Sequence, residues 1–550
     1  MIASLKPDGH MATIMPHGVL FRGGKEKLIR EKLIENDVIE AIISLPSGLF
    51  YGTGIPACVL VVNKSKPDEL RDKILFVNAD REYAEGKAQN KLRPEDVEKI
   101  DFVFTHKKEY PKYSRLVSRQ EIAEQHDYNL NIRRYVDNTP EPEPEDVTAH
   151  LMGGIPDREI VSQGVEFARF RVEPETLFQP LREGYRAFGA TIASKSEIKT
   201  MLEADTNLQN TIAQHYETLE SWWQVARDDF AMLCNDEGES NQMPEVRREL
   251  LAGLKESLIV LGVLDEFQSA GVFVNWWQQI RYDLKTIINT GWHHTLIPDE
   301  YLIGAFFQDD VRAIEDLEGQ ISGLQGELSE AIESAQEVAS YELEEDESVT
   351  ATLIKKALKD LVDDLKDSAG SSAAAELARY RAAYDAIANF EKQIKDLKAN
   401  VSSKQKELDL KLRLKRVGGE EFQAETLALI AQVTADMAGL KPDKNDKTKL
   451  TKLTKDKSSL EDRLTRIDGL LAAIGGQLTT EEAKGLILQK LYDWVREQLT
   501  RYLNAAKRSL IALVEKLWDK YAVSSQELEA AREETLVELN DYLRKLGYLA

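Results

Sequence analysis

The residues best suited to chemistry are concentrated in one segment of the 550-residue chain, the eleven residues PSGLFYGTGIP at Pro46–Pro56. Three glycines and two aromatic residues stand close together there: Gly48, Phe50, Tyr51, Gly52 and Gly54. The glycines permit backbone conformations that other residues avoid, and the rings stand where solvent or a ligand is expected. A plain hairpin needs only about two to five loop residues. The segment is therefore longer and more aromatic than a connection requires, although on these residues alone a purely structural loop is the alternative.

Two short apolar segments flank this aromatic loop, and both are predicted to be strands. Val38–Leu45 and Ala57–Asn63 are rich in Val and Ile, as strands buried on both faces are. His10–Pro16 and Lys73–Asn78 predict two further strands, and Lys25–Asn36 predicts a helix. The order strand, helix, strand, hairpin fits the later half of a doubly wound sheet with a terminal antiparallel strand. The segments predict only part of such a sheet.

The amino-acid sequences of these segments, and their order in the chain, resemble those of a known protein family. Pro16 is followed by HGVLFRGG at His17–Gly24, and the predicted strand that ends at Leu45–Pro46 leads into LFYGTGIP at Leu49–Pro56. In this order they resemble the modification (M) subunit of type I restriction-modification systems. Further similar segments extend the resemblance over about the first 310 residues: KILFVNAD (Lys73–Asp80), HLMGGIP (His150–Pro156), NWWQQIRYDLKTI (Asn275–Ile287) and GWHHTLIPDEYL (Gly291–Leu302).

The resemblance implies an adenine methyltransferase that transfers a methyl group from S-adenosylmethionine to N6 of adenine in DNA. The target base must leave the duplex, because its amino group is inaccessible to a pocket while paired and stacked. Similar methyltransferases place an aromatic residue in the loop between these two strands. The target-base residues are then Phe50, Tyr51, Gly52, Thr53 and Gly54, with Phe50 or Tyr51 as the stacking face.

Two elements of such an enzyme have no counterpart in the chain. No GxGxxG-like turn follows a predicted strand, and the family's Asn-Pro-Pro-aromatic motif is missing. The sequence therefore predicts a C-terminal fragment of the M subunit, with no complete catalytic set, that alone is inactive and does not bind S-adenosylmethionine. The alternative is a non-catalytic coiled-coil interaction protein with a degenerate methyltransferase remnant. With only Cys58 and Cys234, and with no ligand-spaced motif near His293 and His294, no metal site is predicted.

The net charge of −24 argues against a protein that coats nucleic acid indiscriminately. The first 135 residues carry 22 Lys and Arg against 20 Asp and Glu, about +2, so the acidity lies in the remainder. DNA contacts are therefore expected from local basic patches. The candidates for binding DNA phosphates lie among tyrosines in HKKEYPKYSRLVSR: Lys107, Lys108, Lys112 and Arg115. A solvated surface loop is the alternative for this stretch.

The predicted fold class is α/β plus all-α, a partial Rossmann-like methyltransferase sheet followed by a helical domain and long coiled-coil helices. The predicted divisions are residues 1–138 for the methyltransferase part, 139–147 for a Pro/Glu linker, 148–310 for a helical domain, 311–475 for an antiparallel coiled-coil arm and 476–550 for a helical assembly region. Paired tryptophans in the helical domain are predicted to be core. A lysine-rich segment, Lys441–Lys457, is expected at or near a hairpin tip.

The resemblance also implies partners: DNA, the specificity and restriction subunits of the same system, and a second M subunit. We expect the segment Glu481–Ala550 to meet the specificity subunit, since long apolar seams are docking surfaces. Apolar residues spaced three and four apart form three stripes, Ile314–Val338, Ile387–Leu408 and Leu450–Ile474, which predict coiled-coil heptads. These heptads allow pairing within the chain or between chains. No apolar run of membrane-spanning length and no signal-type N-terminus are present, so a cytoplasmic location is expected.

Overall fold

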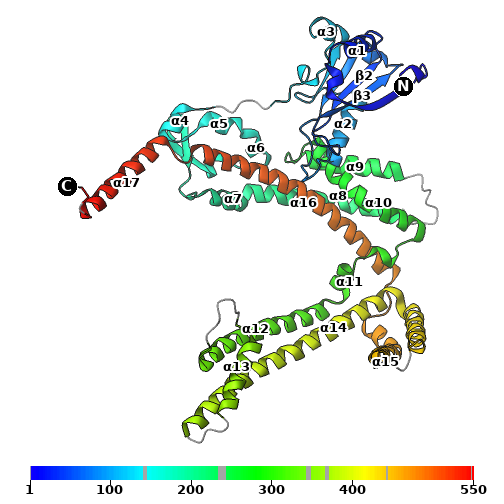
Figure 1. Ribbon diagram of the computed structural model, residues 1–550. Coiled ribbons are helices and arrows are strands. Elements are labelled where there is room, and N and C mark those ends of the chain that lie inside the picture. Colours follow the sequence, from blue (N-terminus) through cyan, green and yellow to red (C-terminus); the bar gives the residue numbers. More distant parts are fainter. Residues whose placement is uncertain are drawn as a thin grey trace. The chain divides into compact units, whose positions relative to one another are not determined.

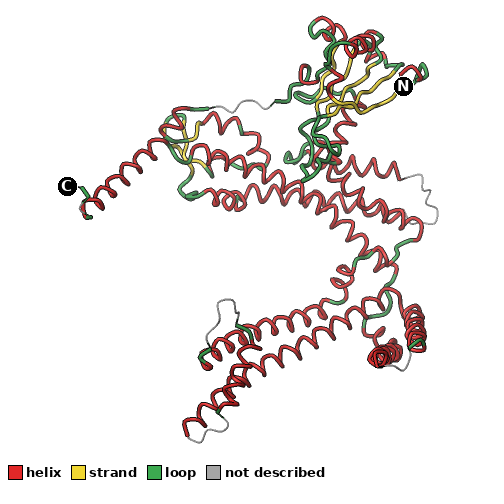
Figure 2. Tube along the Cα trace, viewed as in Figure 1, coloured by secondary structure: helices red, strands yellow, loops and turns green. Residues whose placement is uncertain are grey.

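The computed structural model describes residues 2–139, 145–232, 243–341, 349–365, 371–440, 444–546 and 548–549. Most of the predicted linker, residues 140–144, and Cys234 lie outside these residues. The chain divides into two compact units, Met1–Ile288 with Leu491–Ala550 and Asn289–Lys490. All strands that the structure describes lie in the first unit, and the second consists of helices and loops (Figure 2). The protein is thus mostly helical with a small mixed sheet.

The five-stranded sheet has the order β1-β3-β2-β4-β5. Its strands are β1 (His10–Pro16), β2 (Ile39–Ser44), β3 (Ala57–Asn63), β4 (Lys73–Asn78) and β5 (Ser114–Ser118). The predicted hairpin is confirmed, since β2 and β3 pair antiparallel. β3 also pairs antiparallel with β1, and β2 pairs parallel with β4. β1, β2 and β4 therefore all run in the same direction.

Helices cover both faces of this sheet, because β2 is buried at all six positions and needs apolar neighbours on each side (Figure 1). Ile42 faces the core that contains Ile34 of α1 (Lys25–Glu35) and Ile122 of α3 (Arg119–Glu124). Ile43 faces the opposite core, which contains Val103 of α2 (Pro94–His106). α2 extends to His106, because its apolar residues continue to Phe104.

A second, three-stranded sheet lies within residues 148–310, where only a helical domain was predicted. It consists of β6 (Ile155–Pro156), β7 (Phe178–Arg182) and β8 (Tyr185–Phe188), in the order β6-β8-β7. Gly184 turns the chain between β7 and β8 with a φ of 77°, a conformation that favours glycine. Three short helices pack around this sheet: α4 (Val147–Met152), α5 (Asp157–Ser162) and α6 (Gly164–Arg169).

The rest of the first unit is helical and has an aromatic core. Its helices are α7 (Lys195–Ala204), α8 (Thr206–Met232), α9 (Met243–Ile259), α10 (Glu266–Thr290), the part of α16 (Thr480–Tyr521) from Leu491 on, and α17 (Ser525–Lys545). Trp276 is fully buried among five other aromatic rings of α8 and α10. Its indole Nε1 donates a hydrogen bond to Leu491 O of α16 at 2.8 Å. Trp222, Trp223 and Trp276 are core residues, as the sequence predicted, whereas Trp277 is half-buried.

A buried histidine of α8 makes the stability of this part depend on pH. His215 Nδ1 lies 2.7 Å from Thr211 O, while Nε2 is buried without a partner among the described residues. Burial lowers the pKa of His215 below its usual 6.5, so its contribution to stability is present above pH 6.5 and is lost as the pH falls through the folded-state pKa. We expect His215→Leu to flatten the decline in unfolding midpoint between pH 7 and 5. An unchanged decline in urea unfolding curves would show that other groups cause it.

The second unit contains long helices that pack on one another along the predicted apolar stripes. They are α11 (Asp299–Phe306), α12 (Gln308–Ala339), α13 (Ala351–Asp364), α14 (Ser371–Ala438) and α15 (Lys444–Ala473). α12 packs along α14, and α14 packs along α15, so these stripes meet within the chain. At Gly418, with a φ of 79°, α14 is kinked. Most of the lysine-rich segment lies within α15.

The predicted C-terminal helical region contains two helices. α16 ends at Tyr521, and α17 begins at Ser525 after a short break. Ser524 caps α17, because its hydroxyl accepts a hydrogen bond from Glu527 N and the Glu527 carboxylate accepts one from Ser524 N. Among the described residues, no helix is long and apolar enough to cross a membrane.

Candidate functional site

The carboxyl ends of three strands meet at one edge of the sheet, because β1, β2 and β4 run in the same direction. His17 follows β1, the aromatic loop Pro46–Pro56 follows β2, and Ala79 and Asp80 follow β4. In open α/β sheets, ligands bind outside the carboxyl ends of the strands. This edge is therefore the candidate site.

The aromatic loop exposes its two rings at this edge. Phe50 is 38% exposed and Tyr51 is 90% exposed, although both are large apolar side chains. A backbone bridge between Phe50 and Thr53 closes the tip into a tight turn, which Gly52 completes with a φ of 73°. Thr53 Oγ1 accepts a hydrogen bond from Ile55 N at 3.1 Å. The tip of the loop thus exposes two aromatic rings, and contacts within the tip stabilise its backbone conformation.

His17 lies beneath the loop and was not among the candidates from the sequence. Its Nε2 donates to Ala57 O at 3.0 Å and lies 3.3 Å from Ser44 Oγ. Its backbone N–H donates to Pro56 O at 3.3 Å. Burial lowers the pKa of His17, so the ring is neutral at pH 7. His17 therefore joins the ends of β1, β2 and β3 at the base of the loop.

Polar side chains at the end of β4 form a second group at this edge. Asn78 Nδ2 donates to Val136 O at 2.9 Å, while Asn78 Oδ1 is buried and accepts no hydrogen bond from the described residues. Asp80 accepts hydrogen bonds from Arg133 at 3.0 Å and from Asn138 Nδ2 at 2.6 Å. The sequence pattern gave no reason to select these residues, because their partners come from a distant segment.

The predicted phosphate-binding residues are not gathered at this edge. Lys107 forms an ion pair of 2.7 Å with Glu40, which stands at the start of β2 and so at the opposite edge from the aromatic loop. Burial would raise the pKa of Glu40, but hydrogen bonds from Lys107 and Asn63 outweigh it and lower the pKa. Arg115 forms two hydrogen bonds to Glu121, at 2.9 and 3.0 Å.

The other two predicted phosphate-binding residues, Lys108 and Lys112, have exposed side chains. Ser114–Ser118 of the same basic stretch form strand β5, although the stretch resembled a surface loop. No group of three or more His, Cys, Asp and Glu side chains in the described residues is arranged to hold a metal ion.

Comparison with known proteins points to one family. Residues 1–144 match the family model described as N-6 DNA Methylase. The chain is 43% identical over 137 residues to the type I restriction enzyme MjaVIII methylase subunit of Methanocaldococcus jannaschii, covering 24% of this chain and 23% of that protein. It is 35% identical over 143 residues to the MpnII methylase subunit of Mycoplasma pneumoniae, covering 26% of each.

The solved structures that match cover a similar share of the chain. The methyltransferase subunit of a type I restriction-modification system from Streptococcus thermophilus is 40% identical, covers 25% of this chain and 28% of that chain, and has a TM-score of 0.23. The type I restriction enzyme EcoKI M protein is 20% identical, covers 26% and 37%, and has a TM-score of 0.22. The chain thus spans about a quarter of the length of the curated relatives it matches.

Proposed function

We propose that this chain, whose residues 1–144 match the N-6 DNA Methylase family model, supplies the target-base loop and the assembly helices of a type I restriction-modification M subunit. In this proposal the complete subunit transfers a methyl group from S-adenosylmethionine to N6 of adenine in DNA. It works with the specificity and restriction subunits and with a second M subunit. The aromatic loop binds the adenine after it has left the duplex.

One observation carries the proposal: two exposed aromatic rings stand at the carboxyl edge of the parallel strands. Extruding a base from a duplex costs a few kcal/mol, and stacking on an aromatic side chain returns about 1 to 3 kcal/mol. Fluorescence titration with duplexes that carry one unpaired 2-aminopurine tests it. We expect tighter binding than to the fully paired duplex, and equal affinity would contradict the proposal.

The surface around β1 supports the view that the sheet is part of a larger one. Among the described strands, β1 pairs only with β3 and therefore forms an edge of the sheet. Ile14 of β1 and the α1 residues Leu28 and Ile29 are each more than half exposed. An apolar groove of about 620 Å³ contains Ile29 and is lined in part by Met11 and Met15. Long apolar edge strands are normally covered. We propose that the remaining part of the methyltransferase sheet covers this surface.

The cofactor S-adenosylmethionine is then held mainly by residues outside this chain. The glycine-rich turn that would carry it has no counterpart in the sequence. The described residues at the site edge are an aromatic tip, a neutral histidine, amide groups and the ion pair of Asp80 with Arg133, which do not fit a cofactor pocket by themselves. We expect isothermal titration of this chain with S-adenosylmethionine to show no saturable heat. Micromolar binding would contradict the fragment proposal.

The apolar surface of α17 supports the assembly role. Several of its apolar residues are exposed in the chain: Leu528, Leu536, Val537, Leu539 and Tyr542. The residues of α16 from Leu491 on, in contrast, form part of the core of the first unit, where Leu499 and Val514 are fully buried. We therefore assign the contact with the specificity subunit to α17.

Removing residues 525–550 should abolish binding to the specificity subunit and leave the fold intact, because α17 buries none of its residues. The measurement is pull-down of the specificity subunit with the complete chain and with the truncated chain. A matched control replaces Glu529 and Glu533, two exposed acidic residues of α17, by glutamine, which preserves the apolar surface. Undiminished pull-down by the truncated chain would contradict this assignment.

A further inference from the structure

A second loop at the site edge holds the aromatic loop in place. We call Ala79–Arg93, between β4 and α2, the support loop. Three carbonyl oxygens of the aromatic loop accept hydrogen bonds from it: Ser47 O from Asn90 Nδ2 at 2.9 Å, Gly48 O from Asn90 N at 2.9 Å, and Leu49 O from Gln89 Nε2. These three carbonyls directly precede Phe50. The aromatic tip therefore takes its position from the support loop as well as from its own strands.

The support loop is itself closed by internal hydrogen bonds. Ala84 and Lys91 exchange two backbone hydrogen bonds, of 2.8 and 3.0 Å, and Gly86 N donates to Asn90 Oδ1 at 3.3 Å. The same Asn90 side chain thus closes its own loop and holds Ser47. An ion pair between Glu82 and Lys99 joins the support loop to α2. Displacing the start of α2 would therefore displace Gln89 and Asn90, which donate hydrogen bonds to the aromatic loop.

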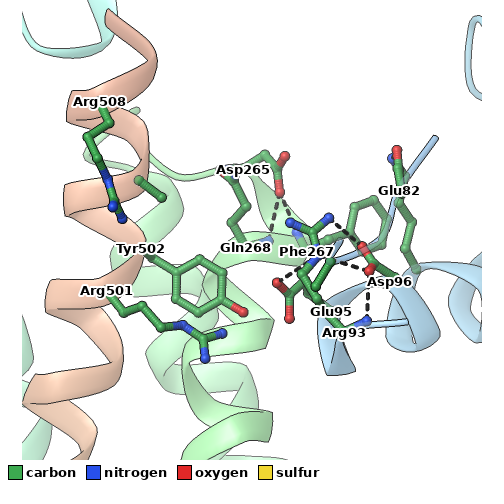
Figure 3. A pocket seen from close by; sticks show the side chains of 13 residues that line it. Glu82, Arg93, Glu95, Asp96, Asp265, Phe267, Gln268, Arg501, Tyr502 and Arg508 are labelled. Carbon is green, nitrogen blue, oxygen red and sulfur yellow. Dashed lines mark hydrogen bonds and ion pairs between the residues drawn. The ribbon is translucent and has the colours of Figure 1, made fainter. Parts of the chain in front are cut away.

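The start of α2 is anchored on the helical part of the same unit. Figure 3 shows Tyr502 of α16 pointing toward Glu95 of α2, and both residues line a cavity of about 390 Å³. Asn275 Nδ2 of α10 donates to Tyr502 Oη at 3.0 Å and lies 3.4 Å from Glu95 Oε2. Burial raises the pKa of Tyr502, and the neighbouring Glu95 raises it further. The hydroxyl is therefore neutral, and Asn275 joins it to the buried Glu95 side chain.

We call the side chains of Glu95, Asn275 and Tyr502 the anchor. Close packing of α10 against them leaves these side chains little space to move. A Cβ atom on Gly271 of α10 would lie 2.3 Å from Tyr502 Oη and 2.9 Å from Glu95 Cβ, so α10 meets both residues through bare backbone. Beside it, Arg93 donates two side-chain hydrogen bonds to Asp96, of 2.9 and 2.7 Å, at the point where the support loop becomes α2.

We propose that the support loop is the positioning element of the aromatic loop, and that the Glu95–Asn275–Tyr502 group sets its position from helices α10 and α16. Gln89 and Asn90 are then positioning residues, since they touch the loop backbone and not the base. The proposal rests on the proposed function for its role in base binding. The geometric part, that these contacts hold the aromatic loop, stands apart from that function.

The first experiment removes the two side-chain donors without changing side-chain size. In the double variant Gln89→Glu and Asn90→Asp, each amide donor becomes an acceptor that faces a carbonyl oxygen. Hydrogen–deuterium exchange of the full chain should then be faster by at least about tenfold at the backbone amide of residue 90, which donates to Gly48 O. Exchange in β2 and β3 should not change. Unchanged exchange at this amide would overturn the proposal.

The second experiment tests the anchor with a matched pair of variants on α16. Tyr502→Phe removes the hydroxyl that accepts a hydrogen bond from Asn275 beside Glu95. Tyr521→Phe removes a hydroxyl that donates to the buried carboxylate of Glu159. We expect Tyr502→Phe to accelerate exchange in residues 84–91, and Tyr521→Phe to leave this segment unchanged. Acceleration confined to α10 and α16, or equal effects of the two variants, would overturn the role of the anchor.

A third readout separates this proposal from the proposed function. The affinity of each variant is measured for a duplex with an unpaired 2-aminopurine and for a fully paired duplex. The Gln89→Glu, Asn90→Asp variant should weaken only the former, because the exposed ring is no longer held in place. If the unsubstituted chain shows no preference between the duplexes, the proposed function fails, and the exchange experiments still decide whether the support loop positions the aromatic loop.

Discussion

Replacing Trp276 by alanine is expected to lower the free energy of unfolding of the first unit by about 3 to 5 kcal/mol, the range observed for buried Trp and Phe side chains. The side chain is fully buried, and its ring lies 5.5 to 6.3 Å from five other aromatic rings. Its removal leaves a cavity and also leaves Leu491 O of α16 without its indole donor. Urea unfolding followed by circular dichroism measures the loss.

Trp277 is the matched control for this substitution. It is the same residue type on the same helix, but it is half-buried and stacks on Phe273 with a centroid distance of 5.4 Å. Trp277→Ala should therefore shift the midpoint by clearly less than Trp276→Ala, since less area is buried. Equal shifts for the two variants would contradict the assignment of Trp276 to the centre of the core.

The second large effect concerns DNA. Alanine at whichever of Phe50 and Tyr51 stacks on the extruded base should weaken binding to the duplex with an unpaired 2-aminopurine by about 1 to 3 kcal/mol, roughly 5- to 150-fold. Both rings are exposed, so neither substitution opens a cavity in the core. Affinity for the fully paired duplex should not change. Fluorescence titration of both duplexes with each variant measures the two effects.

Ile55→Ala is the control from the same loop, because Ile55 is exposed and apolar but has no ring. We expect it to leave the preference for the unpaired base intact. Substitution of Phe50 or Tyr51 by leucine should restore little of the lost affinity, since stacking requires a flat π surface. If Ile55→Ala weakens binding as much as both aromatic substitutions, general apolar contact and not stacking explains the affinity.

The strands of the large sheet could be predicted wherever they are apolar runs. β1 and β4 begin and end where the sequence placed them, and the hairpin of β2 and β3 was expected. The insertion of β3 between β1 and β2 could not be predicted, because it depends on pairing between segments about 40 residues apart. β5 was missed because its exposed positions carry polar and basic side chains, and burial by tertiary contacts overrides that pattern.

The candidate site was only partly predictable, for a similar reason. Glycine and aromatic residues in one short segment identified the loop from local sequence alone. His17 could not be identified from the sequence, because it is the pairing of β1 with β3 that brings His17 to Ala57. Lys107 looked available to phosphate because its acidic partner, Glu40, lies 67 residues earlier in the chain. Local composition indicates charge, whereas the fold decides whether that charge is already paired.

The central claim is that the aromatic loop contacts an extruded adenine, and photo-cross-linking tests it most directly. A duplex with a single unpaired 8-azidoadenine is irradiated with the full chain, and the cross-linked peptides are identified by mass spectrometry. The proposed function predicts that the main cross-link falls within residues 47–56, at Phe50 or Tyr51. A main cross-link outside this loop, or equal labelling from a paired 8-azidoadenine, would contradict it.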